Sequence, residues 1–208
     1  MAGKIHQSAP AGPERFAFNS DNLRHAQEVM ARYPEGRQQS ALMPLLMLAQ
    51  SQSGGWLPKS AMDYVAGLLS LPPVRVYEVA SFYTMYNLDP VGRNVINVCT
   101  TTPCWLRGSD AIVEACQNHL GIACGETTPD GLFTLREVEC LGACVNAPMC
   151  QIINENGEYY YEDLTSQSVI QLIDVVTQRR QPKTGPQSGR KSSEPAAFSN
   201  EEKGAGDA

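Results

Sequence analysis

Two pairs of closely spaced cysteines constrain this chain more than any other feature of its sequence. The first pair is Cys99-x4-Cys104, the second is Cys140-x3-Cys144, and 35 residues separate them. Each pair follows a segment with strand character, so we expect both pairs to lie in loops on the same side of one sheet. Four thiolates on a rigid frame are the donor set of an iron–sulfur cluster. The spacing therefore predicts such a cluster, most simply [2Fe-2S].

The residues around these cysteines suit a cluster. Small residues accompany the second pair, and Gly142 among them permits a positive φ angle. Backbone N–H groups and nearby hydroxyls can donate hydrogen bonds to sulfur and so tune a cluster. The hydroxyls expected to do so are those of Thr100, Thr101 and Thr102.

Other uses of four cysteines remain open. A structural zinc ion is one alternative, although zinc sites usually have tighter x2 pairs. Disulfides are another, although they are rare in a reducing compartment. The spacing also differs from C-x4-C-x2-C and from C-x2-C-x2-C-x3-C, which are the patterns of generic ferredoxins.

The remaining cysteines and the histidines are predicted to have no role in the site. Cys116 lies on the apolar face of a predicted helix, Cys124 in a loop and Cys150 at the start of a strand. Cys150 is the main competitor for the cluster because it is close to Cys144 in sequence. The three histidines are expected to be isolated from any partner, and we nominate no catalytic residue: His6, His25 and His119.

Composition excludes two function classes. The net charge of -6 argues against binding to nucleic-acid phosphates. The longest apolar run, residues 41–49, contains Pro44 and is far shorter than the roughly 20 residues of a membrane span. The N-terminus lacks the apolar core of a secretory signal, so the protein is expected to stay in the cytoplasm, with its cysteines reduced.

Composition and hydrophobic pattern divide the chain into four parts: a flexible N-terminus (1–18), a helical bundle (19–90), an α/β region (91–180) and a polar tail (181–208). Four helices are expected in the bundle. The first helix is expected to be capped by Asn19, Ser20 or Asp21, and the second by Ser40, with Pro44 in its first turn. Pro58 is expected in the first turn of the third helix, and Pro72-Pro73 begins the fourth. The tail, by composition alone, is expected to be disordered.

The α/β region shows the order βα-β-ββα. Strands are predicted at residues 93–98, 133–138, 150–154 and 158–161, and Asn156-Gly157 marks a hairpin turn between the last two. One helix is predicted at 108–120, and another begins at Asp163 or Thr165. The fold class is therefore α+β, with a small α/β sandwich that carries the cysteine loops at one edge.

Two segments make the chain recognisable. VINVCTTTPCWLRGSDAI and EVECLGACVNAPMCQIINENGEYYYEDLT resemble the 24 kDa-type, or E-type, thioredoxin-like [2Fe-2S] subunit of respiratory complex I, NADH:quinone oxidoreductase. The upstream stretches SALMPLLMLAQSQSGGWLP and VYEVASFYTMY are similar to it too. The tail PKTGPQSGRKSSEPA is similar to tails of the alphaproteobacterial and mitochondrial branch. The resemblance covers about residues 16–197.

The resemblance implies a helical bundle followed by a thioredoxin-like [2Fe-2S] ferredoxin domain and an extended C-terminal tail. The family's ligands correspond to Cys99, Cys104, Cys140 and Cys144, and Pro148 is expected to be cis. The cofactor is one [2Fe-2S] cluster. It exchanges single electrons with FMN on a partner subunit that also binds NADH. This chain has neither G-x-G-x-x-G nor G-x-x-x-x-G-K-[ST], which agrees with that division.

The expected function is electron transfer in a proton-pumping NADH:quinone oxidoreductase. It places the chain beside the flavin subunit and an iron–sulfur subunit, on the cytoplasmic face of a bacterial inner membrane or the mitochondrial matrix side. Alternatives are the diaphorase subunit of an NAD-linked hydrogenase or formate dehydrogenase, and a zinc-stabilised interaction module. The resemblance changes the expectation for residues 181–197 from disorder to an extended arm that docks on a partner subunit. Residues 198–208 are still expected to be free. Basic residues expected at the rim of that arm are Arg179, Arg180, Lys183, Arg190 and Lys191.

Overall fold

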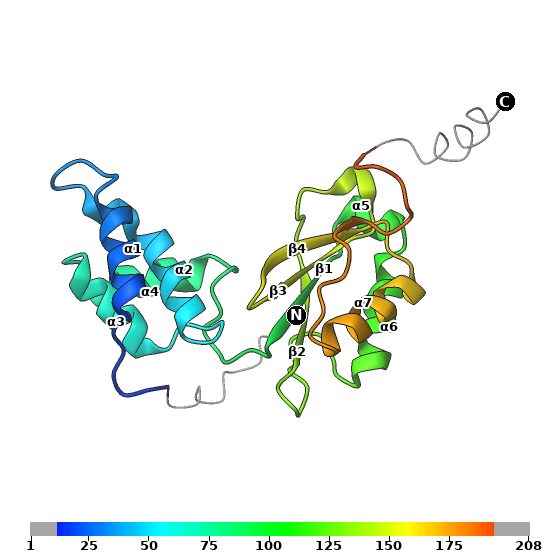
Figure 1. Cartoon of the computed structure of the whole chain (residues 1–208), viewed down its shortest axis with the longest axis horizontal. Helices are drawn as coiled ribbons and strands as arrows, with labels where there is room; N and C mark the ends of the chain where they lie inside the picture. Colours follow the sequence, from blue (N-terminus) through cyan, green and yellow to red (C-terminus); the bar gives the residue numbers. More distant parts are fainter. Residues whose placement is uncertain (1–11, 194–208) are drawn as a thin grey trace. The chain divides into compact units, whose positions relative to one another are not determined.

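The computed structural model describes residues 12–193, and the chain divides into two compact units between Val91 and Gly92 (Figure 1). Expectations for His6, for most of the N-terminal segment and for the end of the tail from residue 194 lie outside the described residues. Of the helices between residues 12 and 193, none has the length and hydropathy that a membrane span requires.

The first unit is built from helices. They are α1 (Ser20–Met30), a 3₁₀ turn η1 (Gln38–Ala41), α2 (Leu42–Gln52), α3 (Lys59–Leu68) and α4 (Pro73–Phe82). Asn19 caps α1 because its side chain accepts a hydrogen bond from the backbone N–H of Asn22. The core gathers one apolar face from each helix, and its fully buried members include Ala26, Leu45, Leu46, Ala49, Val65 and Val76.

Two start signals in this unit differ from the prediction. Ser40 does not cap α2, because it lies inside η1, where the Leu42 N–H already donates to the Gln39 carbonyl. The 3₁₀ turn therefore replaces a side-chain cap. Pro44 lies in the first turn of α2, as predicted, whereas Pro58 is the residue before α3 and not part of its first turn.

The second unit contains a five-stranded sheet in the order β2-β1-β3-β4-β5. Its strands are β1 (Asn94–Cys99), β2 (Phe133–Val138), β3 (Cys150–Asn154), β4 (Gly157–Glu162) and β5 (Gly185–Pro186). β1 pairs with β2 in parallel and with β3 antiparallel, and β3 and β4 form the predicted hairpin. β5 adds a short parallel edge to β4.

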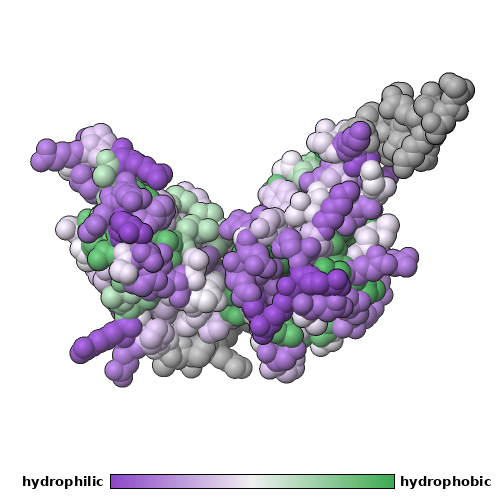
Figure 2. Space-filling model, viewed as in Figure 1, coloured by the Kyte–Doolittle hydropathy of each residue, from purple (hydrophilic) through white to green (hydrophobic). Residues whose placement is uncertain are grey.

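Two helices, α6 (Ser109–Leu120) and α7 (Ser166–Thr177), lie side by side along one face of this sheet (Figure 1). Thr165 caps α7 through a capping box with Ser168, so the later of the two predicted starts is correct. The core between sheet and helices includes Ile96, Leu135, Ile152 and Tyr161 from the strands and Ile112, Cys116, Val169 and Ile173 from the helices. The outer surface of this unit is mostly polar in the view of Figure 2.

Local structure around the cysteines is more regular than predicted. Cys99 is the last residue of β1, and Cys104 lies in a short helix, α5 (Thr102–Leu106), not in a loop. Pro103 suits the start of this helix, whose five residues are too few to produce a hydrophobic period. Cys144 begins a second 3₁₀ turn, η2 (Cys144–Asn146).

Two expectations about polar residues are wrong. Residues 181–193 do not behave as their composition predicts, because they pack along β4 and hold Arg190 in an ion pair with Asp163 of the same unit. His119 is not isolated, because its Nε2 atom lies 3.0 Å from Asp174 Oδ1, and neither is His25, whose Nδ1 atom lies 3.6 Å from Glu28 Oε2. The contacts of Arg190 and His119 join residues far apart in the sequence, which no local pattern reveals.

Candidate metal centre

The four predicted ligands meet at one end of the sheet. Parallel pairing sets Cys99, the last residue of β1, opposite Val138, the last residue of β2, so the chain leaves both strands at the same end. The segment after β1 carries Cys104, and the segment after β2 carries Cys140 and Cys144. Both pairs therefore follow strands at the same end of one sheet, as the sequence predicted.

The thiols form two pairs. Cys104 donates a hydrogen bond to the Cys99 sulfur, and the Sγ atoms of Cys140 and Cys144 are 3.3 Å apart. The pairs also act on one another, because charge on Cys99 disfavours ionisation of Cys140 and Cys144. Within residues 12–193, all seven cysteines are free thiols, so the predicted alternative of disulfides is not realised there.

One thiol of each pair is prepared to ionise. Burial disfavours the charge on Cys99, but donors from Thr101 and the Leu141 backbone outweigh it and lower the pKa of Cys99. The Thr101 hydroxyl lies 3.3 Å from this sulfur, as the sequence predicted for one of the three threonines. The backbone N–H of Gly142, which is 3.4 Å from Cys140 Sγ, likewise lowers the pKa of Cys140.

The partner thiols are held in the protonated form. Burial, followed by the hydrogen bond to Cys99, raises the pKa of Cys104 to about 12. The hydrogen bond to Cys140 and burial raise the pKa of Cys144. A bound cation reverses this preference because a coordinating thiol is deprotonated outright.

The site has a buried side and an exposed side. Cys99 and Cys104 are buried in a small apolar cluster with Ala147 and Met149, whereas Cys140 and Cys144 are exposed. Gly142 has φ +85°, and no atom lies within 4 Å of the position of a Cβ there, so this glycine is required for its backbone conformation rather than for space.

Two supports of the second loop were not predicted. The Tyr160 hydroxyl donates to the Leu141 carbonyl at 2.9 Å, which ties the loop to β4. Its sequence signal is the alternation of β4, since Tyr161 faces the helices and Tyr160 therefore faces the cysteine side. The Ala147–Pro148 peptide bond is cis, as the resemblance implied.

Cys150 and Cys116 lie on the other side of the sheet. Cys150 pairs with Val98 of β1 and is buried in the core beneath α6 and α7. Because successive side chains of a strand alternate, Cys99 points to the opposite face. Burial raises the pKa of Cys116 to about 12 and raises that of Cys150 as well. Neither therefore competes for the site.

A [2Fe-2S] cluster fits this donor set. The four cysteines come as two pairs, and these pairs supply the four thiolates that such a cluster requires. Backbone and hydroxyl donors already point at the sulfur atoms.

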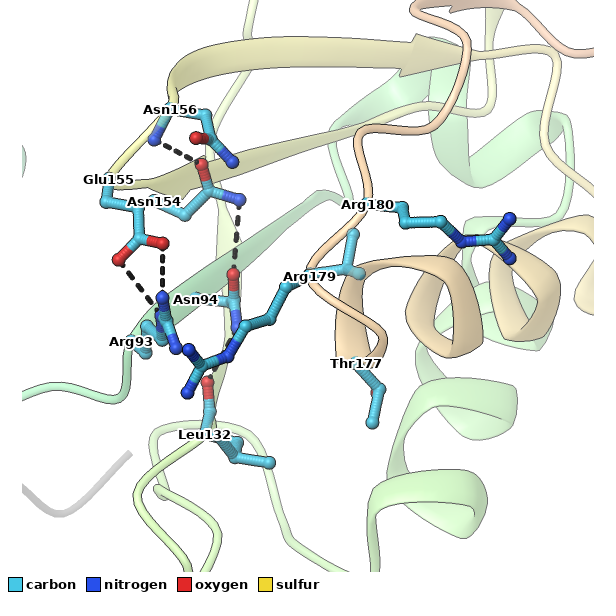
Figure 3. A pocket seen from close by; sticks show the side chains of 10 residues that line it. Arg93, Asn94, Leu132, Asn154, Glu155, Asn156, Thr177, Arg179 and Arg180 are labelled. Atoms are coloured by element: carbon cyan, nitrogen blue, oxygen red, sulfur yellow. Dashed lines mark hydrogen bonds and ion pairs between the residues drawn. The ribbon is translucent and has the colours of Figure 1, made fainter.

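The cavity in Figure 3 lies at the other end of the sheet, where β1 begins and β3 ends. Arg93 makes two hydrogen bonds to Glu155, and Asn154 donates to Asn94 Oδ1 at 3.1 Å. Arg179 points toward the Arg93–Glu155 pair, and its charge helps to lower the pKa of Glu155, for which the hydrogen bond from Arg93 is the main cause. These polar groups satisfy one another and hold the hairpin.

Known proteins resemble this chain over most of its length. The family model "Thioredoxin-like [2Fe-2S] ferredoxin" matches residues 26–177. NADH dehydrogenase [ubiquinone] flavoprotein 2, mitochondrial, of Dictyostelium discoideum is 54% identical over 179 residues, which cover 86% of this chain and 71% of that protein. The E-type subunit of NADH-quinone oxidoreductase from Rickettsia conorii is 55% identical over 159 residues, which cover 76% of this chain and 93% of that protein.

A solved structure supports the fold. The chain resembles an NAD+-reducing [NiFe]-hydrogenase in the H2-reduced state with a TM-score of 0.57 and 24% identity, over 68% of this chain and 23% of that one. The matches confirm the fold class and the resemblance that the sequence predicted. This chain belongs to the thioredoxin-like [2Fe-2S] ferredoxin family, in the branch that contains the E-type subunit of NADH-quinone oxidoreductase and its mitochondrial counterpart.

Proposed function

We propose that this chain is the [2Fe-2S] electron-transfer subunit of a proton-pumping NADH:quinone oxidoreductase and that Cys99, Cys104, Cys140 and Cys144 are its cluster ligands. One observation carries the proposal: two thiol pairs lie at the shared end of the parallel strands β1 and β2, in a chain of this family. In domain terms, the helical bundle expected at residues 19–90 extends to Val91, and the cluster domain begins at Gly92 and includes residues 181–193, which add β5 to its sheet.

The chain's own residues prepare the site for one-electron chemistry. The cluster, when bound, supplies a centre that accepts and releases single electrons. Thr101, Leu141 and Gly142 direct donors at the sulfur atoms of Cys99 and Cys140. Donors to sulfur stabilise negative charge, so they favour the reduced state and raise the reduction potential. The buried side of the site limits access of water.

The exposed side of the site faces the electron partner in this proposal. Large exposed apolar side chains directly follow two of the ligands in the sequence: Trp105 (56% exposed) and Leu106 (70%) follow Cys104, and Val145 (67%) follows Cys144. Exposed apolar groups of this kind are typical of interaction surfaces. The partner expected at this surface is the subunit that binds FMN and NADH. A second iron–sulfur subunit is expected as a neighbour in the complex.

The names of two relatives support membership of such a complex. Both are NADH oxidoreductase proteins, one of them mitochondrial. We therefore expect the chain on the cytoplasmic face of a bacterial inner membrane, or on the matrix side in a mitochondrion. The likeness to a hydrogenase rests on fold alone and does not favour that alternative.

Anaerobic purification of the full chain tests the proposal. The protein is expected to be coloured, to contain iron and sulfide, and to give one S = 1/2 EPR signal after reduction with dithionite. Cys144→Ser is expected to lose the cluster because an alkoxide is a poorer ligand for iron than a thiolate. Cys116→Ser is the matched control and is expected to keep it.

Two results would contradict this function. A colourless wild-type protein that carries zinc and no iron would refute the cluster. Purification of the native complex with a hydrogenase or formate dehydrogenase, and without an FMN-binding NADH:quinone oxidoreductase subunit, would refute the assignment to complex I.

A further inference from the structure

The chain after α7 returns along the sheet to the ligand loops. Residues 181–193, which we name the strap, run from the end of α7 past β4 toward the end of the sheet where α5 lies (Figure 1). Gly185 and Pro186 pair with Tyr161 and Glu162, and the Gln187 N–H donates to the Glu162 carbonyl at 2.9 Å. The strap thus has a defined path on its own unit.

Arg190 anchors the strap to the turn between β4 and α7. Its Nε atom donates to Asp163 Oδ2 at 2.6 Å, and its Nη2 atom donates to Asp163 Oδ1. The two side chains are only 10% and 12% exposed. Ser188 of the strap donates to the same carboxylate at 2.8 Å. A two-pronged guanidinium–carboxylate pair of low exposure is geometrically specific.

The same arginine reaches the second ligand loop. Its Nη2 atom also donates to the carbonyl of Val145 at 3.3 Å, and Val145 directly follows Cys144. Asp163 contributes from its backbone, since its N–H donates to the Asn146 carbonyl at 2.8 Å. Asp163 adopts φ +53°, a left-handed conformation that few residues other than glycine accept.

Asn146 links the loop to the strap a second time. The residue is 4% exposed, and its Nδ2 atom donates to the carbonyl of Ser192 at 3.1 Å and to Glu162. The residues after Cys144 are therefore held by the strap and by the β4–α7 turn together. Cys144 itself is exposed and lies in a 3₁₀ turn of three residues, which is too short to be rigid alone.

We propose that the strap positions Cys144 for the cluster, with Arg190 as the positioning residue that locks the loop through Asp163 and the Val145 carbonyl. This inference rests on the proposed role of Cys144 as a ligand. A ligand that is already in place loses less conformational freedom when the metal binds, so the cluster is held more tightly. The segment is then part of the metal centre, although it carries no ligand.

Three variants of the full-length chain test this role. Arg190→Gln removes the charge and the ion pair, and Arg190→Lys keeps the charge but not the two-pronged contact. Lys183→Gln is the matched control, because Lys183 is an exposed residue of the same strap and its replacement changes the charge equally. Each protein is reconstituted with iron and sulfide, and iron release to ferrozine and the EPR spectrum of the reduced protein are recorded.

Loss of a second-layer support typically weakens metal binding about 10- to 100-fold. Arg190→Gln is expected to bind iron more weakly by about that factor, which appears as faster release to ferrozine, and to show a shifted or broadened EPR signal, with Arg190→Lys intermediate. Lys183→Gln is expected to match the wild type. A shift in EPR signal distinguishes positioning from a loss of stability alone, which circular dichroism monitors on the same samples.

Wild-type iron release and an unchanged EPR spectrum in Arg190→Gln would overturn the proposal. If Arg190→Gln does not fold, Arg190→Lys decides: a wild-type spectrum and release rate in that variant would also overturn it. Absence of iron from the wild type itself would instead refute the proposed function, so the two failures remain distinct.

Discussion

Replacement of Cys150 by serine separates a structural cysteine from a ligand. Cys150 is fully buried on β3, opposite Val98 and Tyr161, in the apolar core under α6 and α7. A serine hydroxyl there exchanges a weakly polar sulfur for a group that needs a hydrogen-bond partner. The thiol of Cys116, whose ionised form would raise the pKa of Cys150, is only a weak hydrogen-bond acceptor.

The expected cost follows from this burial. A hydroxyl moved from water into an apolar site without a partner costs about 1–3 kcal/mol in protein mutants. In a domain of about 100 residues, each kcal/mol of lost stability lowers the thermal unfolding midpoint by about 4–8 °C. Cys150→Ala is the matched control, because it removes the sulfur without adding a hydroxyl, so the difference between the two variants isolates the polar penalty.

Two measurements on the same variants check the reasoning. Urea unfolding of the metal-free protein gives the free energy of unfolding, and iron content after reconstitution gives cluster binding. Cys150→Ser is expected to lose stability and to keep its iron. Loss of iron with an unchanged free energy of unfolding would show that Cys150 binds the cluster, and would refute both its structural role and the ligand set.

Two further predictions concern stability. The free energy of unfolding is expected to fall as pH rises above 9.0. The Cys116 thiol of the unfolded chain ionises near that ordinary pKa, whereas burial raises its pKa in the folded protein to about 12. The loss is up to about 1.4 kcal/mol per pH unit between these two values. Urea unfolding at about pH 8 and pH 10 checks it, and an equal fall in Cys116→Val would refute this cause. Gly92→Ala is expected to cost about 1–3 kcal/mol, because the new Cβ would lie 2.6 Å from the Phe133 carbonyl carbon. Its control is Gly67→Ala, which fills open space in α3 and is expected to raise the free energy of unfolding by about 0.5–1 kcal/mol. Equal urea midpoints for the Gly92 variant and the wild type would contradict the β1–β2 register.

Much of this fold was predictable because its signals are local. The strand at Phe133–Val138, the hairpin around Asn156-Gly157 and the cap at Thr165 all depend on residues within a few positions of one another. Short elements escaped prediction for the same reason. The helix that carries Cys104 has five residues, and the 3₁₀ turn before α2 has four, so neither spans enough residues to show a period.

The sequence by itself determined which cysteines lie in two pairs after strands, and a family resemblance assigned those pairs to a cluster. Only the tertiary structure decided how they meet, through the parallel pairing that sets Cys99 opposite Val138. It also decided that Cys150 faces the core and that the tail returns so that Arg190 reaches Asp163. Spacing along a chain is a local property. Which face of a strand is buried, and which residue a charge pairs with, depend on elements that are far apart in the sequence and meet only in the folded protein.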